Sequence, residues 1–175
     1  MTVSARSPSQ TIGPFYHEAL RWREGGKVGF PSAGERVVLA GRLFDGAGEP
    51  VGDALVETWQ RLPQGCAPGV APASSNPYAF GRVETAKDGT FRIETAMPAG
   101  EAPALDVTIF ARGLLKALRT RVYLAPRERV RADPAMARLA DSPRLDTLIA
   151  TPGGGAEYRW EVRLQGERET VFFAA

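Results

Sequence analysis

The sequence predicts an all-β fold: an antiparallel β-sandwich that carries an N-terminal arm and one or two short helices. Three observations support this fold class. Most of the chain after residue 34 divides into short stretches that alternate apolar and polar residues, as half-buried strands do. Glycine-rich and Asp-Gly turns separate these stretches at hairpin spacing. About seven short strands of this kind are typical of a sandwich.

Residues 1–34 precede the first strand and form an irregular arm. Its segment TIGPFY contains the pair Gly13-Pro14, which imposes a defined bend. The arm also holds large apolar side chains, namely Ile12, Phe15, Tyr16, Leu20 and Trp22. Because so much apolar surface is unfavourable in water, we expect the arm to lie against either its own domain or a partner.

The predicted strands follow one another through short turns. ERVVLAGRLF is the first, and the turn DGAGEP leads into VGDALVETWQ. KDG joins GRVETA to TFRIETA as an Asp-Gly hairpin, because these turn residues tolerate positive φ. The remaining strands are predicted at LDVTIFAR, LRTRVYLA, YRWEVRLQG and ETVFF. The glycines at 153–155 are expected to form a turn, since they lack the pattern of a phosphate loop.

One helix has clear start signals. Asp133 can cap it, Pro134 suits its first position, and MARLA continues it. The segment 65–77 is rich in proline, alanine, glycine and serine and is predicted to be an exposed loop.

Composition limits the possible functions. A net charge of +2, made of well-mixed charges, argues against a nucleic-acid binder, which needs a clustered basic face. The single cysteine, Cys66, and the single histidine, His17, argue against an internal disulfide, a zinc site and a Ser/His/Asp triad. The segment MTVSARSPSQ lacks the apolar core of a secretion signal, and no long apolar run follows. We therefore expect a soluble, cytoplasmic protein that does not bind membranes.

Two features could contact a ligand. The TIGPFY bend could present backbone groups and a wall of small residues, or it could be no more than a packing arm. Arg112, at a strand end beside a glycine, could form a local ion pair or hold a carboxylate through two hydrogen bonds. The residues alone leave both alternatives open.

Several stretches together resemble the intradiol ring-cleaving dioxygenases. SPSQTIGPFY, DGAGEPVGDALVETWQ, FGRVETAKDGTFRIETAMP, FARGLLKALRTRVYL, DTLIA and YRWEVRLQGERETVFF occur in the same order and at similar intervals in that family. The resemblance covers nearly the whole chain. It is strongest to the alpha chains of those members that pair an alpha with a beta chain and act on 3,4-dihydroxybenzoate.

The resemblance implies a sandwich and a ferric ion, Fe(3+), held by two tyrosines and two histidines of the partner beta chain. Ferric iron is a hard acid, so phenolate oxygens suit it. In this chain the histidine pair falls on Ala104 and Asp106, and the tyrosines fall near Ala67 and Glu101. The four tyrosines present, Tyr16, Tyr78, Tyr123 and Tyr158, lie at other positions. The resemblance therefore implies no metal ligand and no catalytic residue in this chain.

The family also implies a shared substrate pocket. The residues that match its pocket at the alpha–beta interface are Thr11, Gly13, Pro14 and Arg112. They are predicted to bind substrate together with the beta chain of an alpha–beta hetero-oligomer. The arm, 1–34, is predicted to pack on that partner, and 35–175 to form the sandwich domain. The chain would then be a non-catalytic subunit in the breakdown of aromatic compounds, needed for the conversion of 3,4-dihydroxybenzoate and O₂ to 3-carboxy-cis,cis-muconate.

Two other functions were weighed. The first is a stand-alone binding module, similar to transthyretin-like or carbohydrate-binding domains, that uses Trp59 and Phe80 as a platform. Ligand binding by the isolated chain would favour it. The second is a self-sufficient intradiol enzyme with an unusual ligand set. Iron and a burgundy colour in the isolated chain would favour that one.

Overall fold

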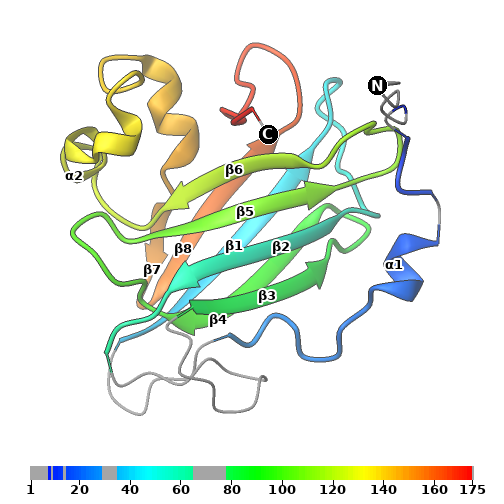
Figure 1. Ribbon diagram of the computed structural model, residues 1–175, viewed down its shortest axis with the longest axis horizontal. Coiled ribbons are helices and arrows are strands. Elements are labelled where there is room, and N and C mark those ends of the chain that lie inside the picture. Colours follow the sequence, from blue (N-terminus) through cyan, green and yellow to red (C-terminus); the bar gives the residue numbers. More distant parts are fainter. Residues whose placement is uncertain (1–7, 9, 14, 29–34, 65–77, 175) are drawn as a thin grey trace, which may run out of the picture.

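The computed structural model describes residues 8, 10–13, 15–28, 35–64 and 78–174. Within these ranges, two four-stranded sheets pack face to face, in the orders β4-β1-β8-β7 and β3-β2-β5-β6 (Figure 1). The strands are β1 (Arg36–Phe44), β2 (Leu55–Arg61), β3 (Tyr78–Glu84), β4 (Thr90–Ala96), β5 (Ala104–Phe110), β6 (Leu118–Tyr123), β7 (Thr151–Gly154) and β8 (Glu157–Arg163). Among the pairs in these sheets, β1 and β8 are parallel and the others are antiparallel. The predicted all-β sandwich is confirmed.

The core lies between the two sheets and follows the alternation of the sequence. On β5, Leu105, Val107 and Ile109 are buried, while Asp106 on the opposite face is exposed. The facing sheet contributes buried apolar side chains from β1, β4 and β8: Val37, Leu39, Leu43, Phe91, Ile93, Trp160 and Val162. Burial of a side chain of this size stabilises a fold by roughly 1.5–3 kcal/mol. The inter-sheet core is therefore the main source of stability.

A helical segment covers the outer face of the second sheet at the end of β6. It consists of α2 (Arg127–Ala132) and the 3-10 turns η1 (Pro134–Met136) and η2 (Pro143–Leu148) (Figure 1). These elements form a second core cluster with Tyr123, into which Ala104 also packs. The beginning of β5 and the end of β6 thus lie beneath this segment.

The structure differs from the local predictions in the helical region and at the glycine turn. Asp133 does cap a helix, accepting a 2.9 Å hydrogen bond from the Ala135 amide, but that helix is the single turn η1. The α-helix of the region is α2, which precedes Asp133 and was missed because its one buried residue, Val130, leaves almost no apolar pattern. Of the glycines expected to form a turn, Gly153 and Gly154 belong to β7 (Thr151–Gly154), whereas Gly155 lies in the turn that leads to β8.

The segment ETVFF is not a strand. Phe173 makes one isolated bridge, with its amide 2.8 Å from the carbonyl oxygen of Arg119. The carbonyl of Val171 accepts a 2.7 Å hydrogen bond from the Thr120 hydroxyl. A side chain therefore takes part in holding the chain end against β6, and no ladder of backbone bonds forms.

The last described part of the arm lies on the chain's own sandwich. Residues 25–28 run between the edge strands β3 and β4: the Gly25 carbonyl accepts from the Arg82 amide at 2.9 Å, and the Val28 amide donates to Glu94 at 2.7 Å. A Cβ atom at Gly25 would lie 2.1 Å from the Arg82 carbonyl oxygen, so only glycine fits there. The arm thereby satisfies backbone groups on two sheet edges that would otherwise be open to other chains.

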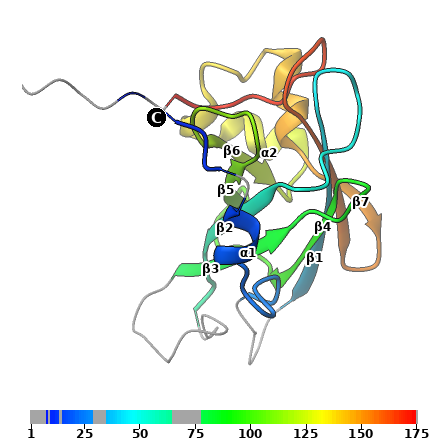
Figure 2. The same cartoon turned by 90° about the vertical axis from the view of Figure 1, so that its right-hand side faces the viewer.

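The short helix α1 (Tyr16–Ala19) continues the arm past the ends of the second sheet (Figure 2). Tyr16 is buried, whereas Phe15 is 72% exposed and Leu20 is 37% exposed. Packing of the arm on a partner stays a prediction, and these exposed side chains are available for it. The predicted loop at 65–77 lies outside the described residues, as does Cys66.

Gly41→Ala tests the inter-sheet packing. A Cβ atom at Gly41 would lie 2.0 Å from Cζ of Phe91, its neighbour across β1 and β4. We expect the substitution to lower the free energy of unfolding by about 1–3 kcal/mol, as overpacked cores do. Urea denaturation would measure the loss, with Ala40→Ser as the control on the same strand. The double variant Gly41→Ala with Phe91→Leu should recover part of the lost stability, because the smaller side chain removes the clash. If the two substitutions instead lower the free energy of unfolding additively, the clash is contradicted.

Candidate functional site

Two places bring together the residues predicted to matter, and they lie at opposite ends of β5. Asp106 lies near its start, and Arg112 lies just beyond Phe110, its last residue. Extended chain rises about 3.3 Å per residue, so the four steps from Asp106 to Phe110 span roughly 13 Å. The two places are therefore described separately.

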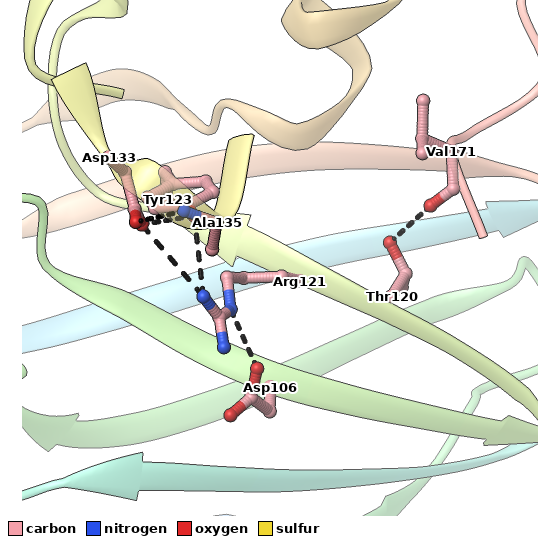
Figure 3. Close-up of polar contacts among 7 residues, drawn as sticks. All are labelled: Asp106, Thr120, Arg121, Tyr123, Asp133, Ala135 and Val171. Carbon is pink, nitrogen blue, oxygen red and sulfur yellow. Dashed lines mark hydrogen bonds and ion pairs between the residues drawn. The ribbon is translucent and has the colours of Figure 1, made fainter. Parts of the chain in front are cut away.

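At the start of β5, an ion-pair network fills the outer face of the sheet (Figure 3). The cross-strand partners are Ala104 with Tyr123 and Asp106 with Arg121. Nε of Arg121 donates to Oδ1 of Asp106 at 2.7 Å, and Nη1 lies 3.4 Å from the Tyr123 hydroxyl. That hydroxyl donates to Oδ2 of Asp133 at 2.6 Å, and Nη1 of Arg121 lies 3.9 Å from the same oxygen. One guanidinium thus joins two carboxylates and a phenol.

The network keeps both central groups protonated. Burial raises the pKa of Tyr123 to about 12; the Arg121 hydrogen bond opposes this rise and the Asp133 carboxylate adds to it. Burial alone would lower the pKa of Arg121, but the hydrogen bonds to Asp106 and Tyr123 outweigh it and raise the pKa. At neutral pH the cluster therefore holds a neutral phenol and a guanidinium cation.

This arrangement does not fit a ferric ion. Ala104 offers no donor atom and packs against the second core cluster. Asp106 is engaged by Arg121, and the Tyr123 hydroxyl donates its proton to Asp133, whereas a metal ligand would be a phenolate. A guanidinium beside these groups would also repel a metal cation. No cluster of three or more His, Cys, Asp or Glu side chains suited to a metal occurs among the described residues.

The other predicted ligand positions add nothing to this place. The position near Ala67 lies outside the described residues, and Glu101 is an exposed residue in a turn. Of the remaining tyrosines, Tyr16 belongs to the arm at the far end of β5. Sequence reasoning did not identify Arg121 and identified Asp133 only as a helix cap, because only the pairing of β5 with β6 and the turn at η1 bring the two residues together.

At the far end of β5, Arg112 forms an ion pair with Asp53. Nε of Arg112 donates to Oδ2 of Asp53, and the Arg112 side chain is still 67% exposed. Tyr16 lies close by: burial and the Asp53 charge raise its pKa to about 12, while the Arg112 charge opposes them. The structure thus brings the arm, the β1–β2 connection and the β5–β6 connection together.

The other predicted site residues belong to the same arm. Thr11 is exposed and Gly13 is partly exposed, with φ of +84° at Gly13, as the predicted bend requires. Pro14 lies outside the described residues. For Arg112, the local ion pair is present and the guanidinium faces solvent, while binding of a ligand carboxylate stays a prediction. Nothing in the sequence pointed to Asp53 as its partner.

Two hollows lie elsewhere on the described part of the chain. A broad one of about 1360 Å³ involves the first sheet and includes Arg92 and Arg163, but both are paired with glutamates. A shallow one of about 420 Å³ lies beside Trp22 and Phe80, whose ring centroids are 5.5 Å apart. Trp59 packs on the same Phe80 at 4.7 Å and is 45% exposed. The predicted aromatic cluster is present, but its central ring, Phe80, already packs against both Trp22 and Trp59 of the same chain.

Comparison with known proteins agrees with these observations. The family model described as Dioxygenase matches residues 13–105. The chain is 36% identical to the protocatechuate 3,4-dioxygenase alpha chain of Burkholderia cepacia over 99% of both chains. It is 34% identical to that of Pseudomonas putida over 95% of both chains. It is also 34% identical to the beta chain of the Burkholderia cepacia enzyme, over 51% of this chain and 39% of that one.

A solved structure supports the fold. 3-Chlorocatechol 1,2-dioxygenase from Rhodococcus opacus 1CP superposes with a TM-score of 0.59 at 18% identity, covering 93% of this chain and 71% of that one. At this level of identity the match concerns the sandwich alone.

Arg121→Met should destabilise the chain, because it leaves Asp106 and Asp133 without their cation. We expect the free energy of unfolding to fall by about 1–2 kcal/mol, the range for hydrogen bonds to charged groups after allowance for partial exposure. Arg119→Met is the matched control, since Arg119 is exposed on the same strand. Equal effects of the two substitutions in urea denaturation would contradict the network.

Tyr123 should make stability fall at alkaline pH. Its pKa rises from 10.0 to about 12 on folding, so between these values the unfolded chain loses a proton that the native chain keeps. The stability that depends on the protonated Tyr123 phenol is fully present below pH 10. On the order of 2 kcal/mol of it is lost by pH 12. Tyr123→Phe should flatten this decline in the free energy of unfolding. A variant that declines as steeply as the native chain would show that Tyr123 does not cause it.

Proposed function

The chain belongs to the intradiol dioxygenase family, and we propose that it is the non-catalytic alpha subunit of a protocatechuate 3,4-dioxygenase. One observation carries this proposal. At the position of the family's histidine ligands, the chain has Ala104 under a core cluster and Asp106 bound to Arg121. A chain that has similarity to alpha chains over its whole length, and no fitting ligand set at that position, is best explained as a subunit that supports a partner's site.

The partner in this proposal is a beta chain that holds Fe(3+). Relatives of this chain include both an alpha and a beta chain of the same enzyme, which supports an alpha–beta complex. Exposed apolar residues occur in both segments near Arg112: Phe15 in the arm is 72% exposed and Leu115 is 60% exposed. Side chains of this size are typical of surfaces that a partner covers. The arm, 1–34, would meet the partner at this end of the sandwich, 35–175.

The substrate in this proposal is 3,4-dihydroxybenzoate, which O₂ converts to 3-carboxy-cis,cis-muconate. Both atoms of O₂ enter the product as the ring bond between the two hydroxyl-bearing carbons breaks. Thr11, Gly13 and Pro14 would wall one side of the pocket, and Arg112 would hold the substrate carboxylate. A fixed cation that pairs with an anionic substrate orients it for reaction. The iron, when bound to the partner, supplies the activation of the catechol.

The binding-module alternative receives less support. Its platform, Trp59 and Phe80, is present, but Trp22 from the arm also stacks on Phe80. No helix in the described part of the chain is long and apolar enough to span a membrane. A cytoplasmic location stays a prediction.

Co-expression with a beta chain tests the proposal. The complex should be burgundy, contain iron and cleave 3,4-dihydroxybenzoate, whereas the isolated chain should be colourless and inactive. Stoichiometric iron in the isolated chain, or failure to associate with any beta chain, would contradict the subunit role.

Arg112→Ala in that complex tests the pocket. Losing a directly made contact to the carboxylate should cost on the order of 1.5–3 kcal/mol, which is about a 10- to 150-fold decrease in kcat/KM. Iron content should not change. Arg131→Ala is the control, because Arg131 also forms an exposed ion pair, with Asp141. Unchanged kinetics for Arg112→Ala would remove this residue from the pocket.

A further inference from the structure

Asp53 has a backbone that the fold holds in place. On one side, the Val51 carbonyl accepts a 2.7 Å hydrogen bond from the Thr85 hydroxyl. On the other, the Ala54 amide donates to the same hydroxyl at 2.9 Å, and Ala54 is fully buried. Gly52 lies so close to Lys87 that a Cβ atom would come within 2.8 Å of its backbone. The carboxylate of Asp53 therefore projects from a rigid turn.

Arg112, by contrast, carries a long side chain on an exposed corner. Gly113 has a φ of +85°, and the Leu114 amide closes the corner on the Ala111 carbonyl at 3.3 Å. Four rotatable bonds separate the guanidinium from this backbone, and its side chain is 67% exposed. A partner on a fixed element is needed to restrict where such a group points.

The contact between the two residues leaves the end of the guanidinium available. Arg112 donates to Asp53 through Nε. A guanidinium has five N–H donors, and four of them belong to the terminal nitrogens Nη1 and Nη2. A carboxylate that approaches end-on can accept from both terminal nitrogens at once. Asp53 thus occupies the one donor that such a ligand does not need.

Tyr16 connects the arm to the same pair. Its side chain is 4% exposed, and the charges of Asp53 and Arg112 both act on its hydroxyl. The arm residues that are proposed to wall the pocket end at Pro14, two positions before Tyr16. The Asp53–Arg112 pair therefore lies close to Tyr16 of the arm, and a movement of either charge would change the electrostatic environment of the Tyr16 hydroxyl.

We infer that Asp53 is a positioning residue: it holds Arg112 through Nε so that Nη1 and Nη2 face the carboxylate of the catechol substrate. It thereby sets the preference for a carboxylated over an uncarboxylated catechol. This inference rests on the proposed function and adds to it a residue and a specificity role. Exposed ion pairs contribute little to stability, so the effect should appear in substrate binding and not in folding. Cover by the partner would lower the local dielectric and strengthen the pair.

The test uses the assembled alpha–beta complex with Asp53→Asn. Dissociation constants are measured without O₂ from the change in the ferric absorption band, for 3,4-dihydroxybenzoate and for catechol, which lacks the carboxylate. We expect the Kd for 3,4-dihydroxybenzoate to rise roughly 5- to 10-fold, which lies within the range of coupling between contacting residues. The Kd for catechol and the urea midpoint should stay unchanged. Asp53→Glu should restore part of the affinity.

Asp141→Asn is the matched control, because Asp141 forms an exposed ion pair with Arg131 elsewhere on the surface. It should leave both dissociation constants unchanged. In the double variant Asp53→Asn with Arg112→Ala, the loss should equal that of Arg112→Ala alone, since both changes remove one interaction.

The outcomes separate this inference from the proposed function. Two outcomes would overturn the role of Asp53 alone. In one, Asp53→Asn raises the Kd of both ligands equally. In the other, Asp53→Asn binds 3,4-dihydroxybenzoate with native affinity although Arg112→Ala binds it poorly. Native affinity of Arg112→Ala for 3,4-dihydroxybenzoate would overturn the role of Arg112 in the proposed pocket, and with it the inference.

Discussion

The ion pair between Arg121 and Asp106 decides what this chain can do. It occupies the face of β5 where the resemblance places the family's histidine ligands, and it joins that strand to β6 and, through Tyr123, to Asp133. A guanidinium is a permanent cation, so it stabilises the charge of both carboxylates at neutral pH. The helical segment packs over Ala104 in a second core cluster, which is separate from the core between the two sheets. The polar groups at this end of β5 thus serve the structure of the chain.

The other end of β5 has kept an exposed, charged surface. Arg112 and Asp53 lie there with the arm, and the arm itself is held on two sheet edges by backbone hydrogen bonds. A catalytic partner can use this surface only if it is presented in a constant shape. The rigid turn at Asp53 and the bound arm provide that constancy, because neither depends on flexible side chains alone. An ion-pair network at one end of the strand and an exposed, charged surface at the other are therefore compatible in one chain.

The sequence predicted the sandwich because its inner-face residues alternate cleanly, as Leu105, Val107 and Ile109 do. It predicted the cap at Asp133 correctly but not α2, whose charged residues surround a single buried valine. Local pattern also could not show that ETVFF is held through side chains, or that β8 pairs in parallel with β1. For the site, resemblance located Ala104, Asp106 and Arg112. Asp53 and Arg121 became visible only through contacts between segments far apart in the chain.

The most direct measurement is the structure of the alpha–beta complex with bound 3,4-dihydroxybenzoate, with iron located by anomalous scattering at its absorption edge. We predict an iron peak in the beta chain and none near Asp106, with Nη1 and Nη2 of Arg112 at hydrogen-bond distance from the substrate carboxylate. An iron peak coordinated by residues of this chain would contradict the central claim. So would a complex in which Arg112 and the arm face bulk water, far from any substrate.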